Sequence, residues 1–162
     1  MTIFLFILLS VGAVILDQLT KLLAVNLLKP IDTCPIIKDV LHLTYSENTG
    51  AAFGMLKNAR WVFMVFSAVA IIAIIAYFFT VKPTDKLCVV SLAFILGGGI
   101  GNMIDRIFIG YVVDFIDFRL IDFAIFNGAD SFITVGAALL VLYFIISEVK
   151  TAREKKNESK DN

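Results

Sequence analysis

Two aspartates lie where packing and solubility do not explain a carboxylate. Asp114 interrupts the apolar run YVVDFI, and Asp130 lies in the polar segment NGADS just before a long apolar stretch. Taken by itself, Asp130 is typical of a helix N-cap, where aspartate is among the preferred residues. Asp114 has no such explanation, because a carboxylate in an apolar run needs a partner or a function. We therefore interpret Asp114 as functional and Asp130 as its candidate partner.

Such a pair of carboxylates has a defined chemistry. Two aspartates held close together in a partly dry site do not both ionise easily, so they share one proton. The ionised carboxylate can act as a general base on water, while the protonated carboxyl hydrogen-bonds a scissile carbonyl. This is the state that peptide hydrolysis needs. The titration belongs to the pair, so both assignments of the proton stay open.

Other polar residues lie inside apolar segments, where each is a functional candidate. Asp17 and Lys21 are four residues apart with the acid first, the favourable order for an ion pair on one helix face. We expect this pair to be structural. Asn102 and Arg106 are also four apart, and their side chains can bind carbonyls or a carboxylate. Asp105 lies beside them.

Composition excludes several other kinds of site. The chain has one histidine, His42, and two cysteines, Cys34 and Cys88, with neither an HExxH nor a CxxC pattern, so we expect no metal and no cofactor. The formal net charge is zero and the basic tail is short and mixed in sign, so we expect no nucleic acid partner. The cysteines should be free, because the topology below separates them by the membrane.

The elements that position these residues must lie in a membrane. The hydrophobic fraction is 59% and Phe occurs 15 times, which is far too apolar for a soluble domain. A spanning helix needs about 20 mostly apolar residues. The stretches that meet this length are residues 2–28, 61–81, 87–109 and 131–149. We predict an integral membrane protein, mainly α, with residues 1–162 forming a single membrane domain.

The two longer connectors contain extended structure. Residues 40–45 alternate in the pattern of a short strand, with His42 on its exposed face. Residues 111–130 are rich in Phe, Ile and Val between aspartates, which favours extended structure on the membrane interface. The predicted architecture is therefore four transmembrane helices with small β or extended elements in the two outer connectors.

The distribution of lysine and arginine indicates the orientation. The short second connector carries Lys82 and Lys86, and the tail over residues 150–162 is basic, so we expect both to be cytoplasmic. Both termini then lie inside and the longer connectors outside. At 1.5 Å per residue, Asp17 lies roughly 22 Å from the cytoplasmic start of its helix, near the outer leaflet. The remaining candidates reach the same layer, which predicts one shared site at the outer face.

Two alternative functions stay open on the residues alone. A small ion-coupled membrane transporter would use intramembrane acids as a proton relay, but it predicts acids throughout the bilayer depth, whereas here they gather in one leaflet. A non-catalytic membrane assembly factor would use Asp130 only as a cap and Asp17 only as an anchor. That alternative leaves Asp114 unexplained, so a peptidase is favoured.

Five sequence blocks resemble a known family, the lipoprotein signal peptidases, also called signal peptidase II. The blocks, in order, are DQLTK (17–21), NTGAAFG (48–54), GNMIDR (101–106), GYVVDF (110–115) and FNGADS (126–131). No single block is specific, but five in this order are. The resemblance extends over the whole chain.

The resemblance implies an aspartic endopeptidase with Asp114 and Asp130 as its catalytic pair. It also implies supporting roles for Asn48, Asn102, Arg106, Asn127, Asp17 and Lys21. The implied reaction removes the signal peptide of a bacterial prolipoprotein by cleavage before the lipobox cysteine, which already carries a diacylglyceryl group. The implied setting is the bacterial cytoplasmic (inner) membrane, with the active site at the outer face. Its partners would be the lipid-modified prolipoprotein and membrane lipids, and we expect a monomer.

Overall fold

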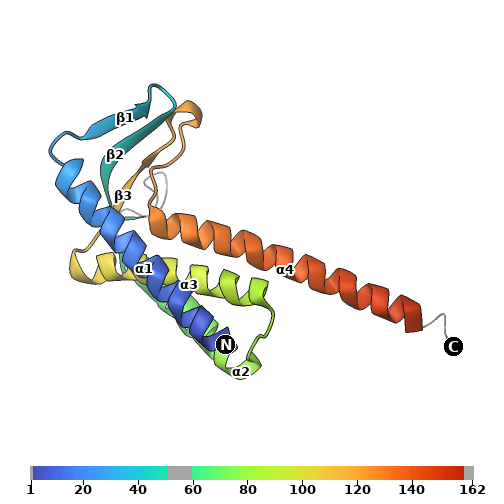
Figure 1. The fold of residues 1–162 in the computed structure, drawn as a ribbon. Helices are drawn as coiled ribbons and strands as arrows, with labels where there is room; N and C mark the ends of the chain where they lie inside the picture. The colour runs from blue at the N-terminus through green and yellow to red at the C-terminus, as the bar shows by residue number, and fades with distance from the viewer. Residues whose placement is uncertain (1, 51–59, 159–162) are drawn as a thin grey trace.

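The computed structural model describes residues 2–50 and 60–158, which form four long helices and a small antiparallel sheet (Figure 1). The helices are α1 (Thr2–Leu27), α2 (Arg60–Val81), α3 (Lys86–Phe108) and α4 (Gly128–Glu158). The strands are β1 (Thr33–Ile37), β2 (Leu41–Asn48) and β3 (Val112–Asp117), and the 3-10 helix η2 (Arg119–Ile121) follows β3. All four long helices have the length and apolar composition to cross a membrane. The predicted fold class is confirmed.

The helix α3 is the centre of the bundle. It packs against α1, α2 and α4. In its apolar membrane-spanning stretch 56% of the residues are buried inside the protein, against 6% in the corresponding stretches of α2 and α4. Two glycines allow this close packing. A Cβ atom on Gly98 would clash with the backbone carbonyl of Ala129 in α4, and one on Gly101 would clash with the carboxylate of Asp17 in α1. The outer faces of α2 and α4 are left for lipid.

The sheet lies beyond the C-terminal end of α1 and close to the start of α4, away from the N-terminus (Figure 1). Its strands are ordered β1-β2-β3 and are antiparallel throughout. Val113 of β3 packs with Ala24 of α1 and with Leu28, the residue after that helix, so the start of β3 is fixed against the end of α1. Ser46 of β2 pairs with Asp114 of β3, which brings the end of β2 beside the candidate aspartate.

The helix α4 is longer than the sequence predicted at both ends. It begins at Gly128 rather than 131, because Asn127 forms a reciprocal capping box with Asp130. The Asp130 backbone N–H donates to Asn127 Oδ1 at 3.0 Å, and the Asn127 backbone N–H donates to Asp130 Oδ2 at 3.3 Å. Asp130 is therefore third in the helix and not its N-cap. Beyond 149 the helix continues through Ala, Arg, Glu and Lys residues, which favour helix.

The prediction that His42 lies on an exposed strand face is wrong. Its side chain is only 7% exposed, because β2 is the central strand and His42 lies between Pro35 of β1 and Asp117 of β3, with its Nδ1 atom 3.4 Å from Thr33 Oγ1. The Leu120 backbone N–H donates to the Val40 carbonyl at 3.4 Å, which ties η2 to the residue before β2. The two cysteines, Cys34 in β1 and Cys88 in α3, are free, as predicted.

Substitution of Gly98 by alanine tests the close approach of α3 and α4. The new methyl group meets helix backbone, which cannot move aside, so Gly98→Ala should lower the free energy of unfolding by roughly 1–3 kcal/mol. Gly99→Ala is the matched control, because a Cβ there would lie 3.6 Å from the Ile71 side chain, an ordinary contact. Thermal unfolding in detergent should show a lower Tm for the first variant only, and equal Tm values would contradict the packing.

Candidate active site

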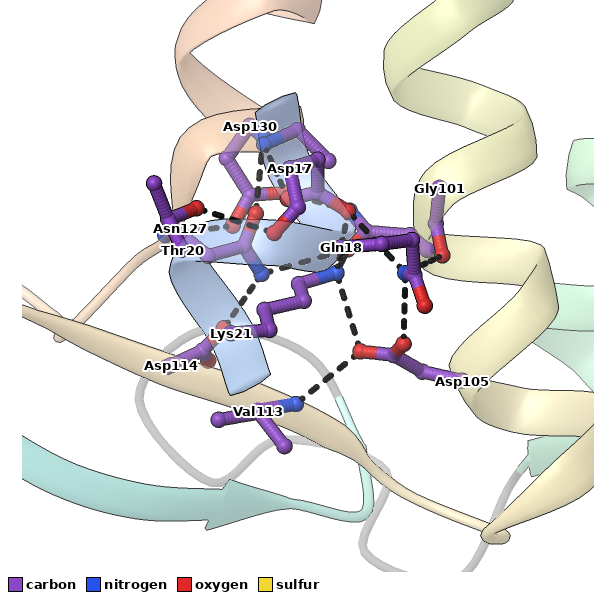
Figure 2. Close-up of polar contacts among 12 residues, drawn as sticks. Asp17, Gln18, Thr20, Lys21, Gly101, Asp105, Val113, Asp114, Asn127 and Asp130 are labelled. Carbon is purple, nitrogen blue, oxygen red and sulfur yellow. Dashed lines mark hydrogen bonds and ion pairs between the residues drawn. The ribbon is translucent and has the colours of Figure 1, made fainter. Parts of the chain in front are cut away.

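The structure brings the predicted site residues together at the end of the bundle that carries the sheet, and Figure 2 labels Asp17, Lys21, Asp105, Asp114, Asn127 and Asp130 among them. Two come from α1, three from α3, two from the start of α4, and one each from β2 and β3: Asp17, Lys21, Asn102, Asp105, Arg106, Asn127, Asp130, Asn48 and Asp114. All of them share one connected set of polar contacts, described below. Residues 51–54 of the NTGAAFG block lie outside the described residues.

Asp114 is held by two asparagine amides. It is 2% exposed and lies at the third position of β3. Asn127 Nδ2 donates to Asp114 Oδ1 at 2.6 Å, and Asn48 Nδ2 donates to Asp114 Oδ2 at 2.9 Å. Both oxygens of this buried carboxyl group therefore accept a hydrogen bond, as buried polar atoms require.

Asp130 is linked to Asp114 through Asn127. The Asn127 side chain donates to Asp114, while its Oδ1 and its backbone N–H hold Asp130 in the capping box. Asn102 Nδ2 donates to the other carboxylate oxygen of Asp130 at 2.8 Å. Asp130 is only partly buried. One asparagine thus fixes the two carboxylates relative to each other.

Lys21 fixes the direction of the Asn102 amide. Its ammonium group is buried and donates to Asn102 Oδ1 at 2.8 Å, and Asn127 Nδ2 donates to the same oxygen at 3.1 Å. A lysine ammonium only donates, so the oxygen end of the Asn102 amide must face it. The nitrogen end of Asn102 is then directed at Asp130.

The charge of Lys21 is balanced by two buried carboxylates. Lys21 Nζ lies 2.8 Å from Asp17 Oδ2, which confirms the predicted ion pair, and 2.9 Å from Asp105 Oδ2 (Figure 2). Each carboxylate also accepts a backbone N–H next to a candidate catalytic residue. Asp17 accepts from Ala129 at 2.8 Å, and Asp105 accepts from Val113 at 3.2 Å.

Gln18 belongs to this network although the sequence analysis did not select it. Its Nε2 donates to Asp105 Oδ1 at 2.9 Å and to the Gly101 carbonyl at 3.2 Å. It therefore holds the side of Asp105 that faces away from Lys21. The signal available in the sequence was an amide side chain inside an apolar helix, directly after Asp17.

Asp130 opens onto a cavity of about 540 Å³. The cavity lies between α2, α3, α4 and the segment that precedes α4, and its polar side chains include Asn48, Arg106 and Ser131. Its apolar lining includes Phe63, Phe123, Phe126 and Val135. Asp114 is not among the residues that line this cavity, but Asn48, which lines it, hydrogen-bonds Asp114 directly. The two aspartates therefore have different access to the cavity.

Arg106 is the cation in the cavity wall. Its guanidinium lies 5.4 Å from the ring centroid of Phe63 on α2, and one of its terminal nitrogens donates to the Asn102 carbonyl at 3.4 Å. A cation stacked on an aromatic ring is held in place while its remaining N–H groups stay free to bind a ligand. Among the described residues, no cluster of three or more acidic, histidine or cysteine side chains is arranged for a metal ion.

The environment of Asp114 alters its protonation. Burial raises the pKa of the Asp114 carboxyl to about 7, and the nearby Asp130 carboxylate adds to this effect. The hydrogen bonds from Asn48 and Asn127 act in the opposite direction and lower that pKa. Because burial has the larger effect, Asp114 holds a proton at pH values where an ordinary aspartate is ionised.

Comparisons with known proteins agree in one family. The family model described as "Signal peptidase (SPase) II" matches residues 9–146. The lipoprotein signal peptidase of Caldanaerobacter subterraneus is 54% identical over 127 residues, which cover 78% of this chain and 86% of that protein. The corresponding protein of Clostridioides difficile is 40% identical over 149 residues, covering 91% and 99%.

Solved structures show the same likeness. A bacterial membrane enzyme solved at 2.3 Å resolution has a TM-score of 0.81 and 34% sequence identity, covering 88% of each chain. A second bacterial membrane enzyme, solved at 1.9 Å resolution, has a TM-score of 0.77 and 35% identity, covering 86% of this chain and 91% of that one. The likeness therefore extends over nearly all of the described fold.

Removal of the Asn48 hydrogen bond tests the electrostatics of Asp114. Infrared titration should show a protonated carboxyl band that disappears with a midpoint near pH 7 and is absent from Asp114→Asn. Asn48→Ala removes a hydrogen bond that lowers this pKa, so the midpoint should move to higher pH. Glu47→Gln, an exposed neighbour on β2, should leave it unchanged. An unmoved midpoint in Asn48→Ala would contradict the assignment.

Proposed function

The chain belongs to the signal peptidase II family of lipoprotein signal peptidases, and we propose that it works as an aspartic endopeptidase with Asp114 and Asp130 as the catalytic pair. The observation that carries the proposal is the asparagine bridge between the two carboxylates, which leaves Asp130 at the cavity and Asp114 buried behind it. Two aspartates in unlike environments have the arrangement that acid and base roles require.

The environments of the two aspartates suggest how the roles are divided. The raised pKa of Asp114 favours the shared proton on that residue, and the role of general base then falls to Asp130, which lines the cavity. In this scheme Asp130 takes a proton from water as the water oxygen bonds to the scissile carbonyl carbon. The carbon–nitrogen bond then breaks, and the leaving nitrogen receives the proton from Asp114. Both carboxylates are restored by exchange of one proton.

Neighbouring groups complete the proposed site. Arg106 lines the cavity beside Asp130, where its guanidinium can stabilise the negative charge that develops on the carbonyl oxygen. Asn102 and Asn127 keep the two carboxylates in position and have their amide directions set by the contacts described above. Lys21, Asp17 and Asp105 act as positioning residues, since their contacts with the pair pass through other groups.

The surroundings of the cavity support a lipid-modified substrate. Its walls are formed in part by Phe63 of α2 and Val135 of α4, two helices with little of their surface buried in the protein. A substrate can therefore keep its acyl chains in the bilayer while its peptide reaches Asp130. We propose that the substrate is a prolipoprotein cleaved before a diacylglyceryl-modified cysteine. The names of the relatives support this substrate class.

The chain is a multi-pass protein of a bacterial membrane, and its placement there completes the proposal. We propose that residues 1–162 form one monomeric membrane domain in contact with membrane lipids, with both termini cytoplasmic and the active site at the outer face of the inner membrane. The basic tail after 150 supports this orientation.

The comparisons support a signal peptidase and not an ion-coupled transporter. The contacts of the acids agree with this result. Asp17 and Asp105 both bind Lys21 and a backbone N–H group, so the oxygens of both carboxylates are used in structural contacts. A proton relay instead needs acids that change partners as they titrate.

Single substitutions test the catalytic pair. Asp114→Asn and Asp130→Asn should each lower the rate of cleavage of a diacylated lipobox peptide by about 10²–10⁴-fold, the usual contribution of a general acid or base. Asp117→Asn is the matched control on the same strand, where Asp117 accepts from Thr44 and Arg119 rather than from the site. A Tm within a few degrees of the parent shows that each variant is folded. Full turnover by either site variant would exclude the pair.

The proposed substrate class has a separate test. The purified protein should cleave the diacylated lipobox peptide, and it should cleave the same peptide without its diacylglyceryl group far more slowly, because the acyl chains hold the peptide at the cavity. Initial rates measured in the same detergent provide the comparison. Equal rates for the two peptides would show that the lipid is not recognised, even if both aspartates proved essential.

A further inference from the structure

A second hollow lies between α2 and α3, apart from the catalytic cavity. It is an apolar groove of about 480 Å³. Only apolar side chains line it: Trp61, Met64, Val65, Ala68, Ile71, Ile72, Met103 and Ile107. It shares no lining residue with the cavity at Asp130. The groove is therefore a separate site.

A cation stands at one end of this groove. Arg60 is the first residue of α2, and its guanidinium lies 5.5 Å from the ring centroid of Trp61, which lines the groove. Within residues 2–50 and 60–158, Arg60 forms no ion pair with a carboxylate, and its buried Nε atom has no hydrogen-bond partner. Among the described residues, this charge therefore has no carboxylate counterion.

The other arginine at this end of α2 and α3 shows the contrast. Arg106 stacks on Phe63 and shares the catalytic cavity with Asp130, so its charge has a role in the site already described. Arg60 stacks on Trp61 instead, and Trp61 lines the groove. The Arg106–Phe63 pair therefore lies at the catalytic cavity and the Arg60–Trp61 pair at the groove. No acidic residue lines the groove.

The length of the groove matches one leaflet of the bilayer. It extends along α2 from Trp61 to Ile72, which at 1.5 Å per residue is about 16 Å. Half of a hydrocarbon core of about 30 Å is about 15 Å. Tryptophan and arginine are typical of the interface, where phosphate groups lie. The cation is thus at headgroup level and the apolar groove at acyl-chain level.

We propose that this groove binds an anionic phospholipid, with its phosphate at Arg60 and one acyl chain lying between α2 and α3. The charge of Arg60 selects an anion, and the apolar lining selects an anion that carries a hydrocarbon chain. The lipid also supplies packing that α2 lacks, since α2 packs chiefly on α3. It thereby holds Phe63 in the wall of the catalytic cavity. The inference does not depend on the catalytic role of the aspartates.

Native mass spectrometry of the purified full chain tests the site. The probes are phosphatidylglycerol and phosphatidylcholine with identical acyl chains, added at equal concentration. Phosphatidylglycerol should be retained about fivefold more, the factor that corresponds to about 1 kcal/mol for one basic residue at a membrane surface. Arg60→Gln should reduce this preference to none. Ala68→Phe, which fills the groove, should reduce retention of both lipids.

Matched variants separate this site from general effects of charge and size. Arg119→Gln removes a cation from the outer sheet region, and Ala73→Phe adds a ring to α2 on a face outside the groove, so both should retain the preference. Equal retention of the two lipids by the parent protein would overturn the proposal. So would an unchanged preference in Arg60→Gln, or loss of bound phosphatidylglycerol on addition of inorganic phosphate. A dimer that persists in the mass spectrum after phosphatidylglycerol is added would also overturn the proposal, because the groove would then be occupied by a second copy of the chain.

Discussion

The buried ammonium group of Lys21 is the interaction on which the site depends. A cation in an apolar bundle must be paired, and Lys21 is paired with Asp17 of its own helix and Asp105 of α3. These carboxylates then bind backbone N–H groups at the start of α4 and in β3. Removal of one member would leave unpaired charge inside the protein, which costs about 3–5 kcal/mol. One cation therefore joins four elements that are far apart in the sequence.

The directions of the Asn102 and Asn127 amides follow from this cation. Lys21 turns the oxygen of Asn102 toward itself, so the nitrogen of Asn102 is directed at Asp130. Asn127 reaches Asp114 with its side-chain nitrogen and Asp130 with its oxygen. The two carboxylates consequently differ: Asp114 is enclosed and its pKa is raised, whereas Asp130 is near the positive end of α4 and faces the cavity.

The bilayer completes a fold that buries little of its own surface. The helix α3 takes most of the internal packing, whereas few residues of the apolar stretches of α2 and α4 are fully buried, so their outer faces are left for lipid. Two of the hollows in the described structure lie beside α2: the catalytic cavity, which contains Asp130 and Arg106, and the groove, which is lined only by apolar side chains. Access from the membrane to the first suits a lipid-modified peptide, and the second suits a lipid of the bilayer itself.

The sequence by itself determined the four spans, because apolar length is a local property, and it identified Asp114, because a carboxylate in an apolar run is conspicuous. It also determined the Asp17–Lys21 pair, since residues four apart share a helix face. Only the tertiary structure decided that Lys21 also binds Asp105, that Gln18 joins this network, that Asn127 and not Asp130 caps α4, and that His42 is buried. These contacts join residues as distant as Asp17 and Ala129, which are 112 positions apart. Their geometry depends on how the helices pack against one another, and the spacing of residues along the chain does not predict that packing.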